Sequence, residues 1–401
     1  MNWNRNFLLL LIGLSLANIG DVLYMVSVIS TIFARTGSAT ASSLVPFTIT
    51  SSMFIASLLT PLLIGKISLN QLLAGSQIVK TILLVVLGFL LLWITASNYY
   101  LVLVNIALIA LLDGCAKPIR QTLIPHYVKS EHLIQANGVA ETVTQMIQSM
   151  MWFVGSLFLM VMSSQQLVWV VGGLFVVASI FLCFLETVHH KPSEPKAKLE
   201  QINEGWKTLS HTPVLRKFAW IDLFETIAGT VWIAAILYVF VSNALHVSEK
   251  WWGFINGAFF LGLIFGSVFC VKFTSFIEKK LGTTIFIGLF LSSTITFLFS
   301  LNSIPIVALL LSLCVGFFGQ IKNIPQQTII QTSVIKAQLA TVYSSLGAIG
   351  TGTFGIASLM MGLLADLFGI RIVFVISALF LAIGSAIVYK NKQLFVSNVG
   401  E

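Results

Sequence analysis

Long apolar runs dominate this sequence of 401 residues and restrict what it can fold into. A helix needs about 20 mainly apolar residues to cross the roughly 30 Å hydrocarbon layer of a membrane. About twelve runs are long enough, so the sequence predicts an all-α polytopic membrane protein with about twelve transmembrane helices. The predicted spans are 7–33, 43–65, 71–95, 99–122, 133–162, 166–187, 217–242, 251–271, 282–301, 304–330, 338–364 and 372–390.

The composition agrees with a membrane protein. Hydrophobic residues make up 57% of the chain and charged residues only 9%, whereas about a quarter of the residues in a soluble protein are charged. The four cysteines (Cys115, Cys183, Cys270, Cys314) all fall inside apolar runs without paired spacing. We therefore expect buried hydrophobic cysteines, with no disulfide framework, no metal site and no cofactor.

The distribution of Lys and Arg residues between the loops predicts the orientation of the chain in the membrane. If the N-terminus is cytoplasmic, the inner loops and ends carry 15 of the 22 Lys and Arg residues, and the outer loops carry three. This excess predicts that both termini are cytoplasmic, and it explains the net charge of +8 without a nucleic-acid partner.

A polar, basic segment divides the chain into two six-helix halves, 1–188 and 214–401, joined by a cytoplasmic linker, 189–213. Within the linker, apolar residues recur at helical spacing from Leu199 to Leu209, which favours an amphipathic helix about as much as a partly ordered loop. The sequence QTLIPHYVKSEHL after the fourth span reappears as QTIIQTSVIKAQL after the tenth, 206 residues later. This similarity indicates two parallel repeats with a substrate site between them.

The stretch KPIRQTLIPHYVKSEHLIQANGVAETVTQ (117–145) resembles the segment after the fourth span in the drug and proton antiporter branch of the major facilitator superfamily, which includes macrolide and siderophore exporters. GLLADLFGIR (362–371) is similar to the closing motif of the same family. The resemblance implies a major facilitator fold. Two family features are absent: the loop after the second span keeps Gly65 but has only Lys66 as a charge, and ATVYSS (340–345) lacks the usual Arg.

Several ionisable residues lie deep within the spans, where an isolated charge costs a few kcal/mol and therefore requires a partner or a polar cavity. The candidates for proton coupling are Asp21, Asp113, Glu141, Asp222 and Glu225. Asp113 and Lys117 are spaced i,i+4, which predicts an ion pair on one helix face. Most of these residues fall on spans one, four, seven and ten, which line the central cavity in this superfamily; Lys80 and Glu141 are the exceptions. The alternative is a set of structural ion pairs.

A second group of residues is suited to binding a substrate. The basic candidates are Lys117, Arg120 and Lys322, although Lys117 and Arg120 also lie close enough to the inner end of their span to extend to the membrane surface. The aromatic candidates are Tyr24, Phe224 and Trp232, which would stack on a planar ligand or, as the commoner alternative, pack against neighbouring helices.

We therefore expect a monomeric, non-enzymatic secondary exporter that exchanges a small organic solute for protons in the plasma membrane of a bacterium, in contact with its lipids. The mixture of acids and bases favours a polar or zwitterionic solute such as a metallophore or siderophore, with a drug as the other possibility. The alternatives are a lipid or lysolipid flippase of the same fold and a non-catalytic membrane scaffold.

Overall fold

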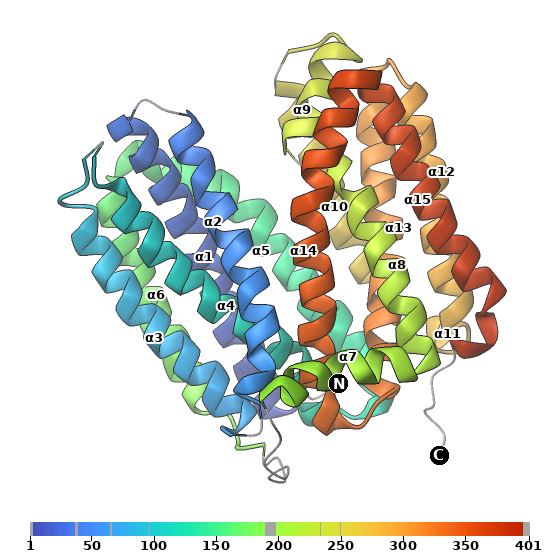
Figure 1. Cartoon of the computed structure of the whole chain (residues 1–401), viewed down its shortest axis with the longest axis horizontal. Helices are drawn as coiled ribbons and strands as arrows, with labels where there is room; N and C mark the ends of the chain where they lie inside the picture. Colours follow the sequence, from blue (N-terminus) through green and yellow to red (C-terminus); the bar gives the residue numbers. More distant parts are fainter. Residues whose placement is uncertain are drawn as a thin grey trace. The chain divides into compact units, whose positions relative to one another are not determined.

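The computed structural model describes residues 3–36, 39–64, 66–95, 97–188, 198–232, 234–248 and 250–395, and nearly all of them are helical (Figure 1). Within these ranges ten helices are long and apolar enough to cross a membrane, or eleven if a bent pair counts as one span. The prediction of an all-α membrane fold is therefore confirmed. The helices of the first half are α1 (Arg5–Thr36), α2 (Ala39–Leu59), α3 (Leu69–Leu90), α4 (Tyr99–Tyr127), α5 (Leu133–Val161) and α6 (Ser164–Cys183).

The remaining helices follow the predicted spans of the second half. They are α7 (Lys198–His211), α8 (Pro213–Gly229), α9 (Ala234–Asn243), α10 (Lys250–Lys272), α11 (Thr274–Glu278), α12 (Leu281–Leu301), α13 (Pro305–Thr332), α14 (Lys336–Phe368) and α15 (Ile370–Lys390). Helix α7 shows that the last part of the predicted linker is helical. Residues 189–197 of that linker and Gly65 of the loop after the second span lie outside the described residues.

The chain folds into two compact units. Unit 1 contains Met1–Val128, Met146–Trp206 and Lys336–Ala348, and unit 2 contains Lys129–Gln145, Lys207–Ile335 and Ile349–Glu401. The first turns of α5 thus belong to unit 2, and the first turns of α14 belong to unit 1.

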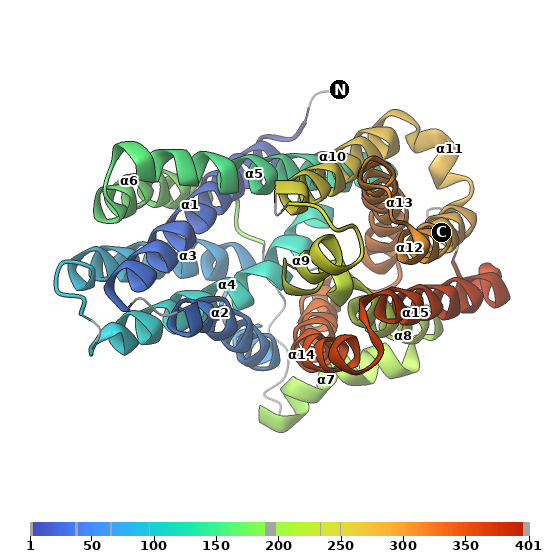
Figure 2. The same ribbon diagram turned by 90° about the horizontal axis from the view of Figure 1, so that it is seen from above.

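In unit 1, α1 packs against α6 and α2, while α3 packs against α4 and α6 (Figures 1 and 2). The core of this unit includes Leu23, Leu87, Ile106 and Phe175, each at most 2% exposed. Because three helices surround α3 and α4 with apolar side chains, any charge on the inner faces of these helices must find its partner within the unit.

In unit 2, α12 packs against α13 and α15, and α8 packs against α15. Helices α10 and α13 approach closely at glycines: a side chain at Gly316 would meet the Phe259 carbonyl oxygen, and one at Gly262 would meet the Leu313 carbonyl oxygen. Small residues permit such close contact, which in a membrane depends on van der Waals packing between helices.

The predicted seventh span, 217–242, is broken. Helices α8 and α9 are separated by a short 3-10 turn (Thr230–Trp232), and the two parts of the span are bent by 47°. Side chains bind the carbonyl groups exposed at the break: the Thr230 hydroxyl donates to the Ile227 carbonyl at 2.7 Å, and the Ser377 hydroxyl donates to the Ala228 carbonyl at 2.7 Å. These bonds make the break tolerable in a membrane, where an unpaired carbonyl is costly.

The contact at Gly316 can be tested against Gly319 on the same helix, where an added methyl group meets no atom within 4 Å. We expect Gly316→Ala to destabilise the protein by about 1–3 kcal/mol because a carbonyl oxygen of α10 occupies the required space. Gly319→Ala should be neutral or slightly stabilising, since alanine favours helices. Thermal unfolding of both purified variants in detergent measures the difference, and equal midpoints would show that α10 and α13 do not pack in this way.

Candidate functional site

The charged cluster of unit 1 is built around Lys80 of α3. Its ammonium lies 2.5 Å from a carboxylate oxygen of Asp21 on α1 and donates a hydrogen bond to Asp113 on α4 at 2.6 Å. The Lys80 side chain is only 2% exposed, whereas the two carboxylates are 25% and 22% exposed. One buried ammonium is therefore shared by two carboxylates from different helices.

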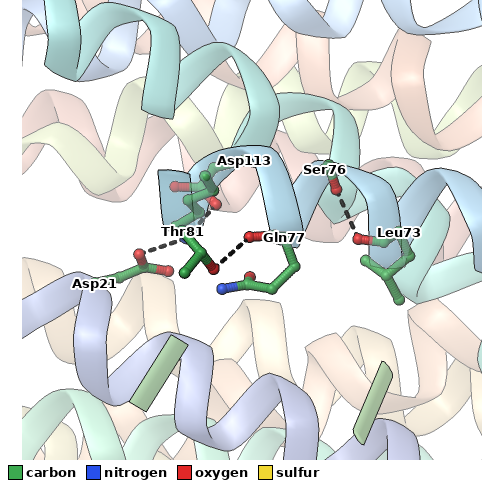
Figure 3. Close-up of polar contacts among 7 residues, drawn as sticks. Asp21, Leu73, Ser76, Gln77, Thr81 and Asp113 are labelled. Carbon is green, nitrogen blue, oxygen red and sulfur yellow. Dashed lines mark hydrogen bonds and ion pairs between the residues drawn. The ribbon is translucent and has the colours of Figure 1, made fainter. Parts of the chain in front are cut away.

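Neighbouring groups fix the position of Lys80. The ring of Phe175 lies 4.8 Å below its ammonium, and the next residue, Thr81, donates to the Gln77 carbonyl and contacts the Ser179 hydroxyl. In Figure 3 the ion-pair lines from Asp21 and Asp113 converge beside Thr81. An aromatic face attracts a cation, so the ring adds to the two ion pairs in holding the ammonium.

The sequence analysis selected Asp21 and Asp113 but not the residue that joins them. It paired Asp113 with Lys117, whereas the structure places Asp113 in an ion pair with Lys80 of the third span. Lys117 is exposed and Arg120 is half-buried on the same helix. The signal for Lys80 was its position twelve residues into an apolar span, where a charge without a partner is costly.

The charged cluster of unit 2 lies between α8 and α13. Lys322 forms an ion pair with Glu225, and the Gln326 side-chain amide donates to Asp222 at 2.6 Å. The two acids are three residues apart on α8 and their partners are four residues apart on α13, so each pair is one turn from the other. Lys322 is 4% exposed and Glu225 is 31% exposed, a distribution similar to that of the cluster in unit 1.

Glu141, the remaining acidic candidate, lies in the part of α5 that belongs to unit 2. It accepts hydrogen bonds from Gln327 of α13 at 3.3 Å and from Gln145 at 3.4 Å. One turn earlier, Asn137 donates to Gln331 at 2.7 Å and Gln331 donates back at 3.2 Å; both residues are at least 96% buried. The printed donors to Glu141 are thus amides, and a buried amide pair joins α5 to the second repeated stretch at Gln331.

The aromatic candidates pack against other side chains. Tyr24 is 1% exposed within the core of unit 1, and Phe224 stacks on Trp220 at 6.0 Å and on Phe380 at 5.8 Å. Trp232 contacts three rings, those of Phe259, Phe299 and Phe374, at centroid distances from 4.8 to 6.1 Å. These contacts match the packing alternative, and stacking on a ligand remains a prediction for the half-buried Phe224 and Trp232.

Each cluster contains two carboxylates and one lysine. If all three groups are ionised, each cluster carries one negative charge in excess, in surroundings where charge is poorly solvated. In unit 1 the positive charge of Arg120 also acts on Asp21. A proton or a cationic group of a substrate would neutralise this excess. No group of three or more His, Cys, Asp or Glu side chains in the described ranges is arranged to hold a metal ion.

A bundle of membrane helices with ionisable side chains inside its spans is the architecture of secondary transporters. Residues 10–351 match the family model of the Major Facilitator Superfamily, and the chain belongs to this superfamily of non-enzymatic carriers of small molecules.

Two relatives from Bacillus subtilis (strain 168) are similar over almost their whole length. The chain is 28% identical to the uncharacterized MFS-type transporter YfmI over 396 residues, which cover 98% of this chain and 97% of the relative. It is 26% identical to the uncharacterized MFS-type transporter YjbB over 375 residues, covering 94% and 92%.

Solved structures of the superfamily show the same fold. The human organic anion transporter MFSD10 (TETRAN) superposes with a TM-score of 0.80 at 11% identity, covering 96% of this chain and 99% of that one. A bacterial homologue of the iron transporter ferroportin, in an outward-facing state, superposes with a TM-score of 0.78 at 14% identity, again covering 96% and 99%. At such identities the similarity concerns the fold alone.

Removal of the Lys80 ammonium tests whether it holds the two acids together. We expect Lys80→Met to destabilise the protein by about 3–5 kcal/mol at neutral pH, because two partly buried carboxylates lose their shared cation. The loss should become smaller as the pH falls, since protonation of one acid removes the repulsion between them. Thermal unfolding between pH 5 and pH 8 measures both effects.

Two further variants make this test specific. Lys80→Met combined with Asp113→Asn should recover most of the lost stability, because one negative charge is removed with the positive one. Lys129→Met removes a lysine whose side chain is 83% exposed and should leave the midpoint unchanged. If Lys80→Met had the same thermal midpoint as Lys129→Met at every pH, the ion pairs of Lys80 would contribute nothing to the stability of the fold.

Proposed function

We propose that the protein is a proton-coupled exporter of a small polar or zwitterionic solute, of the amino-carboxylate metallophore or siderophore type or a drug with similar charges. It would act in the cytoplasmic membrane of a bacterium, with both termini on the cytoplasmic side. The observation that carries the proposal is the single Lys80 ammonium shared by Asp21 and Asp113.

This arrangement gives the acids two stable states. With both carboxylates ionised, the cluster has an excess negative charge that attracts a proton or the cationic group of a solute. When one acid binds a proton, Lys80 and the other acid remain as a neutral ion pair. Because proton and solute cation would neutralise the same charge, binding of one disfavours binding of the other, which is the requirement for antiport.

The distribution of charge also supports a solute that carries both signs. Each unit has an ammonium paired with a carboxylate. In the proposed binding state the ammonium would pair with an anionic group of the solute and the carboxylates with a cationic group. A purely lipophilic cation would leave Lys80 and Lys322 without a function in binding. The excess of Lys and Arg in the predicted inner loops supports the proposed orientation.

A second candidate function is the movement of a lipid or lysolipid. An apolar groove of about 460 Å³ lies between α3 and α6 of unit 1, lined by Ile78, Ile82, Val176 and Ile180. Thr81 and Ser179 also line the groove, so it approaches the residue next to Lys80. An acyl chain would fit these apolar walls.

Transport into everted membrane vesicles separates these functions. The vesicles would contain the protein and be energised by respiration, with three probes: a radiolabelled amino-carboxylate chelator (ethylenediamine-disuccinate), ethidium, and a fluorescent lysophosphatidylethanolamine. We expect uptake of the chelator to stop when nigericin collapses the pH difference and to persist when valinomycin collapses the electrical potential.

Variants connect the transport to the cluster. Asp21→Asn and Asp113→Asn should each lower uptake at least tenfold with unchanged membrane abundance, while Glu131→Gln, at an acid whose side chain is 61% exposed, should not. Uptake that is insensitive to nigericin would contradict proton antiport. Movement of the lysolipid alone would favour the second candidate.

A further inference from the structure

Asp222 of unit 2 differs from the neighbouring acid on the same helix. Glu225 is matched by the ammonium of Lys322, but Asp222 accepts its hydrogen bond from the neutral amide of Gln326. Among the described residues, Lys322–Glu225 is the ion pair formed between α8 and α13. Asp222 is thus a carboxylate within a membrane span whose direct partner carries no charge.

Few other charges act on this carboxylate. Glu225 and Lys322 are the charged groups that face it from α8 and α13, and Arg216 and Lys217 lie in the first turns of α8. Helix α15, which also packs on α8, carries its charged residues, Arg371 and Lys390, at its two ends. An ionised Asp222 therefore keeps a charge that this region does not neutralise, which is costly in a membrane.

Gln326 is a partner that suits both protonation states of Asp222. Its side chain is 4% exposed, its nitrogen donates to the carboxylate, and its oxygen is buried without a hydrogen-bond partner. An amide has both donors and an acceptor, so a half-turn of its terminal bond would present the oxygen to a protonated Asp222. The Lys322 ammonium has only donors, so it can contact Glu225 only as a donor.

We propose that Asp222 and Gln326 form a second proton-binding site, separate from the Lys80 cluster, so that the carrier exchanges two protons in each cycle. The inference rests on the proposed function, because a second proton is useful only to a proton-coupled carrier. The two acids of unit 2 then have different functions: Glu225 keeps an ion pair with Lys322, and Asp222 gains and loses a proton. Gln326 is a positioning residue that accommodates both states.

Infrared difference spectroscopy of the purified protein tests this site without a substrate. Spectra recorded at low and high pH report the carboxylic acids that form as the pH falls. We expect the double variant Asp21→Asn/Asp222→Asn to lose part of the carboxylic acid band of the wild type. Each single variant, Asp21→Asn or Asp222→Asn, should lose about half of that part. The control Glu131→Gln removes an exposed acid of unit 2 and should leave that part of the band intact.

Gln326→Lys provides a test that keeps Asp222 in place. The new ammonium would hold Asp222 ionised, so this variant should lose the same part of the band as Asp222→Asn while retaining its thermal midpoint. If the carboxylic acid bands of Asp222→Asn and Gln326→Lys differed from the wild-type band no more than that of Glu131→Gln does, the proposal of a second proton-binding site would be wrong.

The outcomes also separate this inference from the proposed function. If transport were sensitive to nigericin but the carboxylic acid band of Asp222→Asn were unchanged, the second proton-binding site would be overturned. The proposed function as a proton-coupled exporter would be unaffected. If Asp222→Asn removed its part of the band but transport did not depend on the pH difference, two-proton exchange would be overturned. The site would then bind a proton that is not coupled to transport.

Discussion

The rest of the structure depends on one constraint: a charge inside the hydrocarbon layer must be matched by another group of the protein. In unit 1 this requirement joins three helices, because the ammonium of Lys80 on α3 reaches Asp21 on α1 and Asp113 on α4. In unit 2 the same requirement joins α8 to α13 through Lys322 and Glu225. Each cluster contains one carboxylate more than it contains lysines.

The same constraint explains the uncharged polar groups. The break between α8 and α9 exposes carbonyls, and the hydroxyls of Thr230 and Ser377 bind them. Asn137 and Gln331 bind each other through both ends of their amides. These polar groups have partners nearby, whereas the hydroxyls of Ser292 and Thr296 on α12 are buried without a hydrogen-bond partner. In the proposed second site, the amide of Gln326 suits both protonation states of Asp222.

The sequence alone predicted the helices well, because a span of about 20 apolar residues is a strong local signal. It did not predict the break in the seventh span, since the stabilising Ser377 lies about 150 residues further along the chain. It selected both acids of the Lys80 cluster but not Lys80 itself, because helical spacing reveals neighbours on one helix and not contacts between helices. Tyr24 was a ligand candidate from its position, but its place in the apolar core of unit 1 could be known only from the fold.

In the proposed function, protons enter and leave the cluster formed by Asp21, Lys80 and Asp113. Transient currents on a solid-supported membrane measure this directly, since a pH step applied to proteoliposomes without substrate moves charge only if protons reach buried groups. We expect a current in the wild-type protein and a reduction of at least half in the double variant Asp21→Asn/Asp113→Asn. An equal current in that variant, with equal protein in the membrane, would contradict the assignment of this cluster as a proton-binding site.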